Sequence, residues 1–137
     1  MWEINIWSVL VSAVAAMVIG SIWYGPLFGK KFMEASGMNK WTSEQQAAMK
    51  KKMMASYAAQ FAASFVMFYT VAGIIVGFGH DSALSGMMAA FFVWLGIVVP
   101  IKIGDLVWGG NKTMFWLTSG NMLFTLLAVG AIVGAWN

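Results

Sequence analysis

The sequence contains no cysteine and no arginine, and it has a single histidine, His80. Without cysteine there can be no disulfide bond, no thiolate metal site and no cysteine nucleophile. His80 and the adjacent Asp81 are too few ligands for a dedicated zinc site, and we interpret them as a solvated turn. Acid–base catalysis needs titratable groups positioned within hydrogen-bond reach, and this chain offers almost none in one place. We therefore expect no enzyme, no catalytic residue, no metal site and no cofactor.

Charge of either sign is also scarce. Only 9% of the residues are charged and 61% are hydrophobic, whereas about a quarter of the residues in a soluble domain are charged. The mean hydropathy is +0.77. A chain of 137 residues predicts one domain, residues 1–137, and its solvent is the lipid bilayer. No basic groove interleaved with aromatic residues is apparent, so we expect no nucleic-acid partner.

Four long apolar runs account for most of the chain. A bilayer core about 30 Å thick requires roughly 20 helical residues to cross it. Runs of this length cover about residues 4–24, 53–78, 83–103 and 113–136. Backbone groups in lipid must be hydrogen-bonded within their own segment, and no run alternates as a barrel strand would. The sequence therefore predicts an all-α membrane protein, a four-transmembrane-helix bundle.

The lysines predict how this bundle is oriented. All eight basic residues are lysines, and they lie in residues 27–52 or near the connection between the third and fourth spans, at Lys102 and Lys112. Basic residues are retained on the cytoplasmic side. We expect residues 27–52 to be cytoplasmic and both termini to be non-cytoplasmic, in the plasma membrane (the inner membrane of a bacterium).

Aromatic residues and one cap complete the expected topology. Aromatic rings prefer the two membrane interfaces, which predicts an outer belt of Trp2, Trp7 and Trp136 and an inner belt of Trp23, Tyr24, Trp108 and Trp116. In the cytoplasmic segment, the Thr42-Ser43-Glu44-Gln45-Gln46 sequence combines a hydroxyl with a glutamine three residues later, as in a helix capping box. That helix can continue unbroken into the second span.

Several short motifs resemble a known family. They are Trp23-Tyr24-Gly25-Pro26-Leu27-Phe28-Gly29-Lys30 with Phe32-Met33, Trp94-Leu95-Gly96 with Pro100, the residues Gly104 to Lys112, and Ser119-Gly120-Asn121. Together they cover nearly the whole chain. This combination resembles the small membrane proteins catalogued as "domain of unknown function 1761". The resemblance implies four helices in one unit and implies no activity.

Uncharged polar residues inside the spans are candidate site residues, because polar groups in the membrane are costly. Gln60 and Asn121 are expected at similar depth. Ser56 and Ser64 lie four residues to either side of Gln60, and Thr118 and Thr125 lie near Asn121. These groups can line a path for a small solute, water or an ion. They can equally form interhelical hydrogen bonds worth about 0.6 kcal/mol each.

Lys102 and Asp105 are the charged candidates. They are three residues apart, so they share a helix face if the third span stays helical. Pro100 removes a backbone donor just before them and can kink the helix. The pair is either a carboxylate linked to proton or ion movement and held by an ammonium, or an interfacial ion pair that ends the helix.

Small residues recur at four-residue spacing and predict close helix packing. They are Ser12, Ala16 and Gly20 in the first span, and Gly130 and Gly134 in the fourth. We expect them to pack the first span against the fourth, or copies of the protein against each other.

Two functions remain open. The first is permeation of a small solute or ion by a homo-oligomer, because four spans enclose little volume and a pathway would form between copies. The second is an accessory or assembly subunit of a larger membrane complex, which suits a chain with almost no soluble mass.

Overall fold

The chain folds into a bundle of four long helical segments, in a computed structural model that describes residues 3–136. Four helical segments are long and apolar enough to cross a membrane: Ile6–Leu27, Ser43–Gly77, Ala83–Val107 and Lys112–Trp136. The described part of the chain contains no strand. The predicted all-α, four-span architecture is thereby confirmed.

The first and third spans are each interrupted by a short π-helical turn. The first span is α1 (Ile6–Ile22) followed by the π-turn η1 (Trp23–Leu27). The third is α4 (Ala83–Val93), the π-turn η3 (Trp94–Val98) and α5 (Val99–Val107). The second and fourth spans are the continuous helices α3 (Ser43–Gly77) and α6 (Lys112–Trp136).

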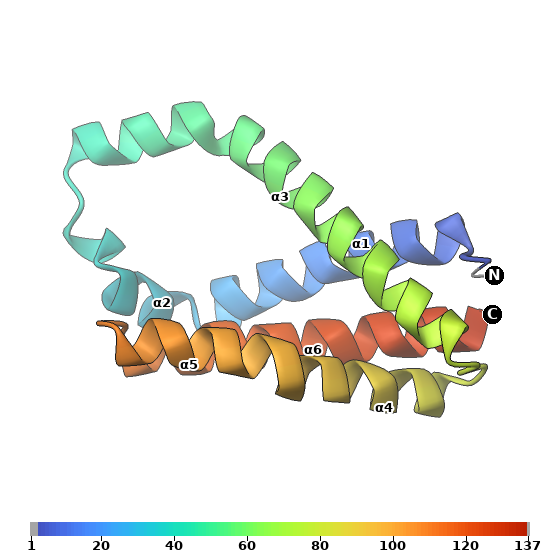
Figure 1. Cartoon of the computed structure of the whole chain (residues 1–137). Coiled ribbons are helices and arrows are strands. Elements are labelled where there is room, and N and C mark those ends of the chain that lie inside the picture. The colour runs from blue at the N-terminus through green and yellow to red at the C-terminus, as the bar shows by residue number, and fades with distance from the viewer. Residues whose placement is uncertain (1–2, 137) are drawn as a thin grey trace.

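Two short helices connect the first and second spans: α2 (Gly29–Ser36) and the 3₁₀ turn η2 (Met38–Lys40). The start of α1 and the end of α6 lie at one end of the bundle, and α2 and the start of α3 lie at the other (Figure 1). The lysines in residues 27–52 therefore belong to the end opposite to the termini.

The helix α3 begins well before the second apolar run. The Thr42 hydroxyl accepts a hydrogen bond from the Gln45 backbone N–H at 3.2 Å, and the Gln45 side chain accepts one from the Thr42 N–H at 2.9 Å. This reciprocal capping box confirms the cap predicted from the sequence. The helix then runs for 35 residues, about 52 Å at 1.5 Å per residue. That is much longer than a bilayer core, so α3 extends beyond the other spans.

The core lies around α6 at the end of the bundle that holds the termini. Val9 and Ala13 of α1 and Ile75 of α3 are buried there with Val129 and Val133 of α6. Every fully buried residue of α3 lies between Phe68 and Ile75. The first half of α3, through Gln60, is exposed and diverges from the other spans (Figure 1).

Glycine allows α4 and α6 to approach more closely than any side chain would permit. A methyl group at Gly86 of α4 would overlap the Gly130 carbonyl, and one at Gly134 would overlap the Ser82 carbonyl. The first and fourth spans do pack together, as expected, and Ser12 is buried. Gly130 and Gly134, however, pack the fourth span against the third, where Gly86 and Ala90 form a matching four-residue spacing. The alternative that small residues pack copies of the protein together stays a prediction.

The two prolines lie beside the π-turns. Pro26 lies within η1, next to Gly25, whose backbone is non-helical (φ −108°, ψ −105°). Pro100 is in the first turn of α5, directly after η3. Proline lacks a backbone donor and clashes with the carbonyl four residues earlier in an α-helix. A π-turn has a different hydrogen-bond spacing, so it changes which carbonyl faces the proline. The third span therefore continues through Pro100 as one helical segment that ends at Val107.

The glycine contact makes a direct prediction. Gly86→Ala forces α4 and α6 apart and should lower the free energy of unfolding by about 1–3 kcal/mol, the usual cost of overpacking. Thermal unfolding of the purified protein in detergent measures the change. Gly104→Ala is the matched control, because nothing lies within 4 Å of a methyl group there. Equal melting temperatures for the two variants would contradict the prediction.

Candidate functional site

Three spans and α5 enclose a cleft of about 870 Å³, which we call the polar cleft. Its lining comprises Ala16, Met17, Gly20, Ser21 and Tyr24 from α1 and η1; Tyr57, Gln60, Phe61, Ser64, Met67 and Phe68 from α3; Thr118, Asn121, Met122 and Thr125 from α6; and Lys102 from α5. Pockets that hold small molecules have volumes of about 300–1,000 Å³. The polar cleft is therefore large enough for a small organic solute.

Helical periodicity explains why these residues meet. The α6 lining residues follow the spacing i, i+3, i+4, i+7, and those of α3 continue the same pattern over one more turn. Residues at this spacing share one helix face. Each helix thus contributes a single continuous stripe, and the separation of α3 from α1 and α6 keeps the stripes apart.

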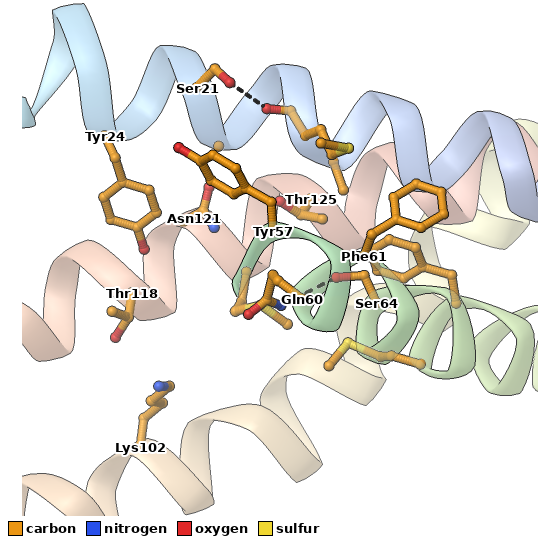
Figure 2. A pocket seen from close by; sticks show the side chains of 16 residues that line it. Ser21, Tyr24, Tyr57, Gln60, Phe61, Ser64, Lys102, Thr118, Asn121 and Thr125 are labelled. Atoms are coloured by element: carbon orange, nitrogen blue, oxygen red, sulfur yellow. Dashed lines mark hydrogen bonds between the residues drawn. The ribbon is translucent and has the colours of Figure 1, made fainter. Parts of the chain in front are cut away.

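The polar cleft has a polar end and an apolar end. Along α3 the stripe begins with Tyr57 and Gln60 and ends with Met67 and Phe68. In Figure 2 Lys102, Tyr24 and Thr118 lie together at one end of the cleft, and Phe61 and Ser64 lie toward the other. The polar end is the one nearer the lysine-rich end of the bundle.

Two of the predicted uncharged residues, Gln60 and Asn121, both line the cleft. The Gln60 amide donates a hydrogen bond to the Ser64 hydroxyl at 3.3 Å. The Asn121 side-chain oxygen is buried and accepts no hydrogen bond from any residue in the described part of the chain. Ser56, expected on the face of Gln60, does not belong to the lining. Asn121 therefore retains an unused acceptor beside the cleft.

Thr125 provides a second unsatisfied group. Its side chain is only 4% exposed, it lines the cleft, and its hydroxyl has no hydrogen-bond partner among residues 3–136. A buried polar group without a partner costs about 1–3 kcal/mol. A solute that hydrogen-bonds to Thr125 and Asn121 would recover that free energy.

The charged candidates separate in the structure. Lys102 is partly buried and lines the cleft, whereas Asp105 is exposed and outside the lining. The two residues lie on the continuous helix α5, yet no ion pair within 4.0 Å joins them in the part of the chain that the structure describes. Lys102 is the one charged residue of the lining, so the cleft carries a positive charge without a carboxylate beside it.

Sequence reasoning missed two hydroxyl groups of the cleft, those of Tyr24 and Tyr57. We assigned Tyr24 to the inner aromatic belt, but its ring packs against Phe32 with the centroids 4.8 Å apart, and its hydroxyl points into the cleft (Figure 2). Tyr57 lies four residues before Phe61, and Ser64 lies three residues after Phe61. This helical spacing was the signal that could have identified Tyr57 as a lining residue.

Trp23, which we also predicted for the inner belt, binds α6. Its indole Nε1–H donates to the Leu117 carbonyl at 2.9 Å. Trp94 does the same to the Ser119 carbonyl at 2.8 Å. Each tryptophan is the first residue of a π-turn. The two indoles thus anchor the first and third spans to neighbouring positions of α6, directly before the lining residue Asn121.

Trp108 and Trp116 keep the surface positions expected of belt residues, with 90% and 72% of their area exposed. Trp7 and Trp136 are exposed at the opposite end, at 66% and 48%. Trp2 lies outside the described residues.

No acid or histidine lines the cleft. Among residues 3–136 no group of three histidines, aspartates or glutamates is close enough to hold a metal ion, and His80 lies in the turn between α3 and α4. The chemistry on offer is hydrogen bonding by hydroxyls and amides beside one ammonium group. This arrangement can bind and select a solute.

The tryptophan contacts predict a stability difference. Trp23→Phe and Trp94→Phe each remove one indole donor and should each lower the free energy of unfolding by about 1 kcal/mol, the typical net value of a hydrogen bond. Thermal unfolding in detergent measures it, with Trp108→Phe as the control because Trp108 is almost fully exposed. A Trp23→Phe protein as stable as the Trp108→Phe protein would show that the bond contributes nothing.

Comparison with known proteins identifies the family of the chain. A family model described as "Protein of unknown function (DUF1761)" matches residues 7–134, which confirms the resemblance seen in the short motifs. No curated protein and no solved structure matches the chain.

Proposed function

The chain belongs to the family described as "Protein of unknown function (DUF1761)", whose description names no activity, and from the geometry we propose that it is a permeation protein for a small hydrogen-bonding solute. The observation that carries this proposal is the convergence of Gln60, Asn121 and Lys102, from three different helices, on one cleft. The role proposed is binding and passage of a solute, without chemical conversion.

The unsatisfied groups support solute binding over simple packing. Polar side chains that merely hold helices together in a membrane find hydrogen-bond partners on those helices. The buried side-chain oxygens without partners in residues 3–136 are those of Ser119, Asn121 and Thr125, and the latter two line the cleft. A polar solute is the partner that fits.

Several rim residues favour entry from the side. Met17, Tyr57 and Met67 line the cleft and are 49%, 57% and 41% exposed. They lie on α1 and α3, which are both long and apolar enough to span the membrane. The mouth between these helices therefore faces the bilayer or a second copy of the protein.

We propose that the protein acts as a homo-oligomer in the plasma membrane (the inner membrane of a bacterium). The exposed first half of α3 borders the mouth of the cleft, and a second copy packed there would complete its wall. The mass of the gently extracted protein, measured by native mass spectrometry, tests this arrangement. A monomer would oppose it.

The solute role predicts which substitutions reduce transport. In proteoliposomes monitored by stopped-flow light scattering with glycerol, urea or acetate, the wild-type protein should raise permeability to at least one solute. Asn121→Leu and Gln60→Leu remove hydrogen-bonding groups and should lower that permeability about tenfold, as expected for a loss of about 1.4 kcal/mol.

Thr70→Val is the matched control for this assay. Thr70 is on α3 but outside the lining, and its hydroxyl donates to the Val66 carbonyl of its own helix at 2.9 Å. Its permeability should equal that of the wild type. Permeability no greater than that of protein-free liposomes for every solute would remove the proposal.

The orientation follows from the lysine end of the bundle. We propose that this end is cytoplasmic and that both termini are non-cytoplasmic, because basic residues are retained inside. A C-terminal fusion to a reporter that is active only in the cytoplasm should be inactive. Strong reporter activity would reverse the topology.

A second candidate is an accessory or assembly subunit of a larger membrane complex. The observation that favours it is the exposed apolar surface of Met54, Phe78 and Phe92, at 80%, 76% and 65%, which a partner protein could cover as well as lipid does. Co-purification with unrelated larger subunits in a fixed ratio would favour this role, and the polar residues would then belong to packing.

A further inference from the structure

We propose that the polar cleft selects a singly charged anionic amphiphile, with its anionic group held by Lys102 and its apolar part lying on α3. This inference rests on the proposed use of the cleft as a solute site and adds the chemical class of the solute. It concerns molecules with a carboxylate or phosphate at one end and an apolar chain at the other.

The charge balance of the lining carries the first step. Lys102 is the one charged residue among those that line the cleft, and it is partly buried. No carboxylate of the described residues lies within 4.0 Å of it. A cation beside an apolar surface attracts an anion more strongly than it does in bulk water, because less water screens the two charges. The cleft therefore favours an anion and disfavours a cation.

The hydrogen-bond inventory gives the second step. Thr118 donates its hydroxyl hydrogen to the Met114 carbonyl at 2.7 Å, so it is not a free donor. The hydroxyl of Tyr24 forms no hydrogen bond within residues 3–136, and Tyr24 lines the cleft at the same end as Lys102. An anion uses donors of this kind together with the three N–H groups of the Lys102 ammonium.

The order of residues along the cleft gives the third step. Lys102 lies at the end shared with Tyr24 (Figure 2), where an anionic head would bind. From Tyr57 to Phe68 the α3 stripe runs about 16 Å at 1.5 Å per residue. Its far end is formed by Met67 and Phe68, which would contact an apolar chain. A charged head followed by an apolar chain matches this gradient along its whole length.

The experiment compares three ligands that differ in the head group alone: decanoate, decylamine and decanol. Wild-type protein in phosphatidylcholine nanodiscs binds radiolabelled decanoate, and the other two ligands compete. We expect decanoate to bind at least about tenfold more tightly than decylamine, a difference that corresponds to one favourable charge contact. Equal affinity for all three would overturn the anion preference and leave solute binding intact. Absence of binding by all three would overturn the solute site itself.

Lysine variants assign the preference to one residue. Lys102→Gln should lose the tenfold preference for decanoate over decylamine, and Lys102→Arg should keep it. Lys112→Gln is the matched control, because Lys112 is exposed at the start of α6 and outside the lining. A preference that survives in Lys102→Gln but falls in Lys112→Gln would assign the effect to surface charge and overturn the inference. The wild-type comparison of the three ligands does not depend on the folding of any variant.

A further displacement measurement identifies the source of the anion. Phosphatidylglycerol in the nanodisc carries the same kind of head and chain as a membrane lipid. Displacement of labelled decanoate by phosphatidylglycerol would support the inference with a lipid as the natural occupant. Retention of decanoate would support it with a free carboxylate as the occupant.

Discussion

The close contact between α4 and α6 is the constraint on which the rest of the bundle depends. Gly86, Gly130 and Gly134 bring two backbones together so tightly that a methyl group at any of them would overlap a carbonyl of the facing helix. In a membrane the helices gain no hydrophobic free energy by leaving lipid for one another, so such packing contacts hold them together. With α4 and α6 fixed, Val9 and Ala13 of α1 and Ile75 of α3 complete the core at the same end.

The same local arrangement occurs twice and positions the helices around the cleft. Trp23 and Trp94 each begin a π-turn, each is followed two residues later by glycine, and each donates its indole N–H to a carbonyl of α6. The α6 carbonyls also belong to the helix ladder, so the indoles add a second donor to each. Gly120 directly follows the second acceptor, Ser119, and its missing side chain leaves room for the Trp23 ring. These two bonds connect the first and third spans to α6 at the depth of Asn121.

Much of the architecture could be predicted because it depends on local patterns. The length of each apolar run and the lack of charge within it identify a membrane span, and the Thr42–Gln45 pair identifies a helix start. Gln60 and Asn121 were identifiable as site candidates because polar residues in a span are unusual. Their meeting in one cleft required the relative rotation of α3 and α6, which no single run reveals.

The features that the sequence did not reveal have a common physical origin. Gly130 and Gly134 indicate a close contact but do not identify the helix they contact. The matching repeat of Ser82, Gly86 and Ala90 was present at the start of the third span, but a repeat alone does not show which two spans pack together. The sequence predicts Trp23 near a membrane interface, but it does not show that α6 lies close enough for the Trp23 indole to donate to the Leu117 carbonyl. Asp105 shares a helix with Lys102, yet it turns outward while Lys102 turns to the cleft. Each of these facts depends on tertiary packing.

The uneven burial of α3 has a mechanical consequence. Its buried residues lie from Phe68 to Ile75, while the half before Gln60 is exposed. A tilt of the helix would therefore pivot near Val71. From that residue to Ser43 the helix is about 42 Å long. A tilt of about 5° at Val71 would move Ser43 by about 4 Å and Gln60 by about 1.5 Å. Because the buried residues lie at one end of α3, a tilt of this helix would displace its lysine-bearing end most.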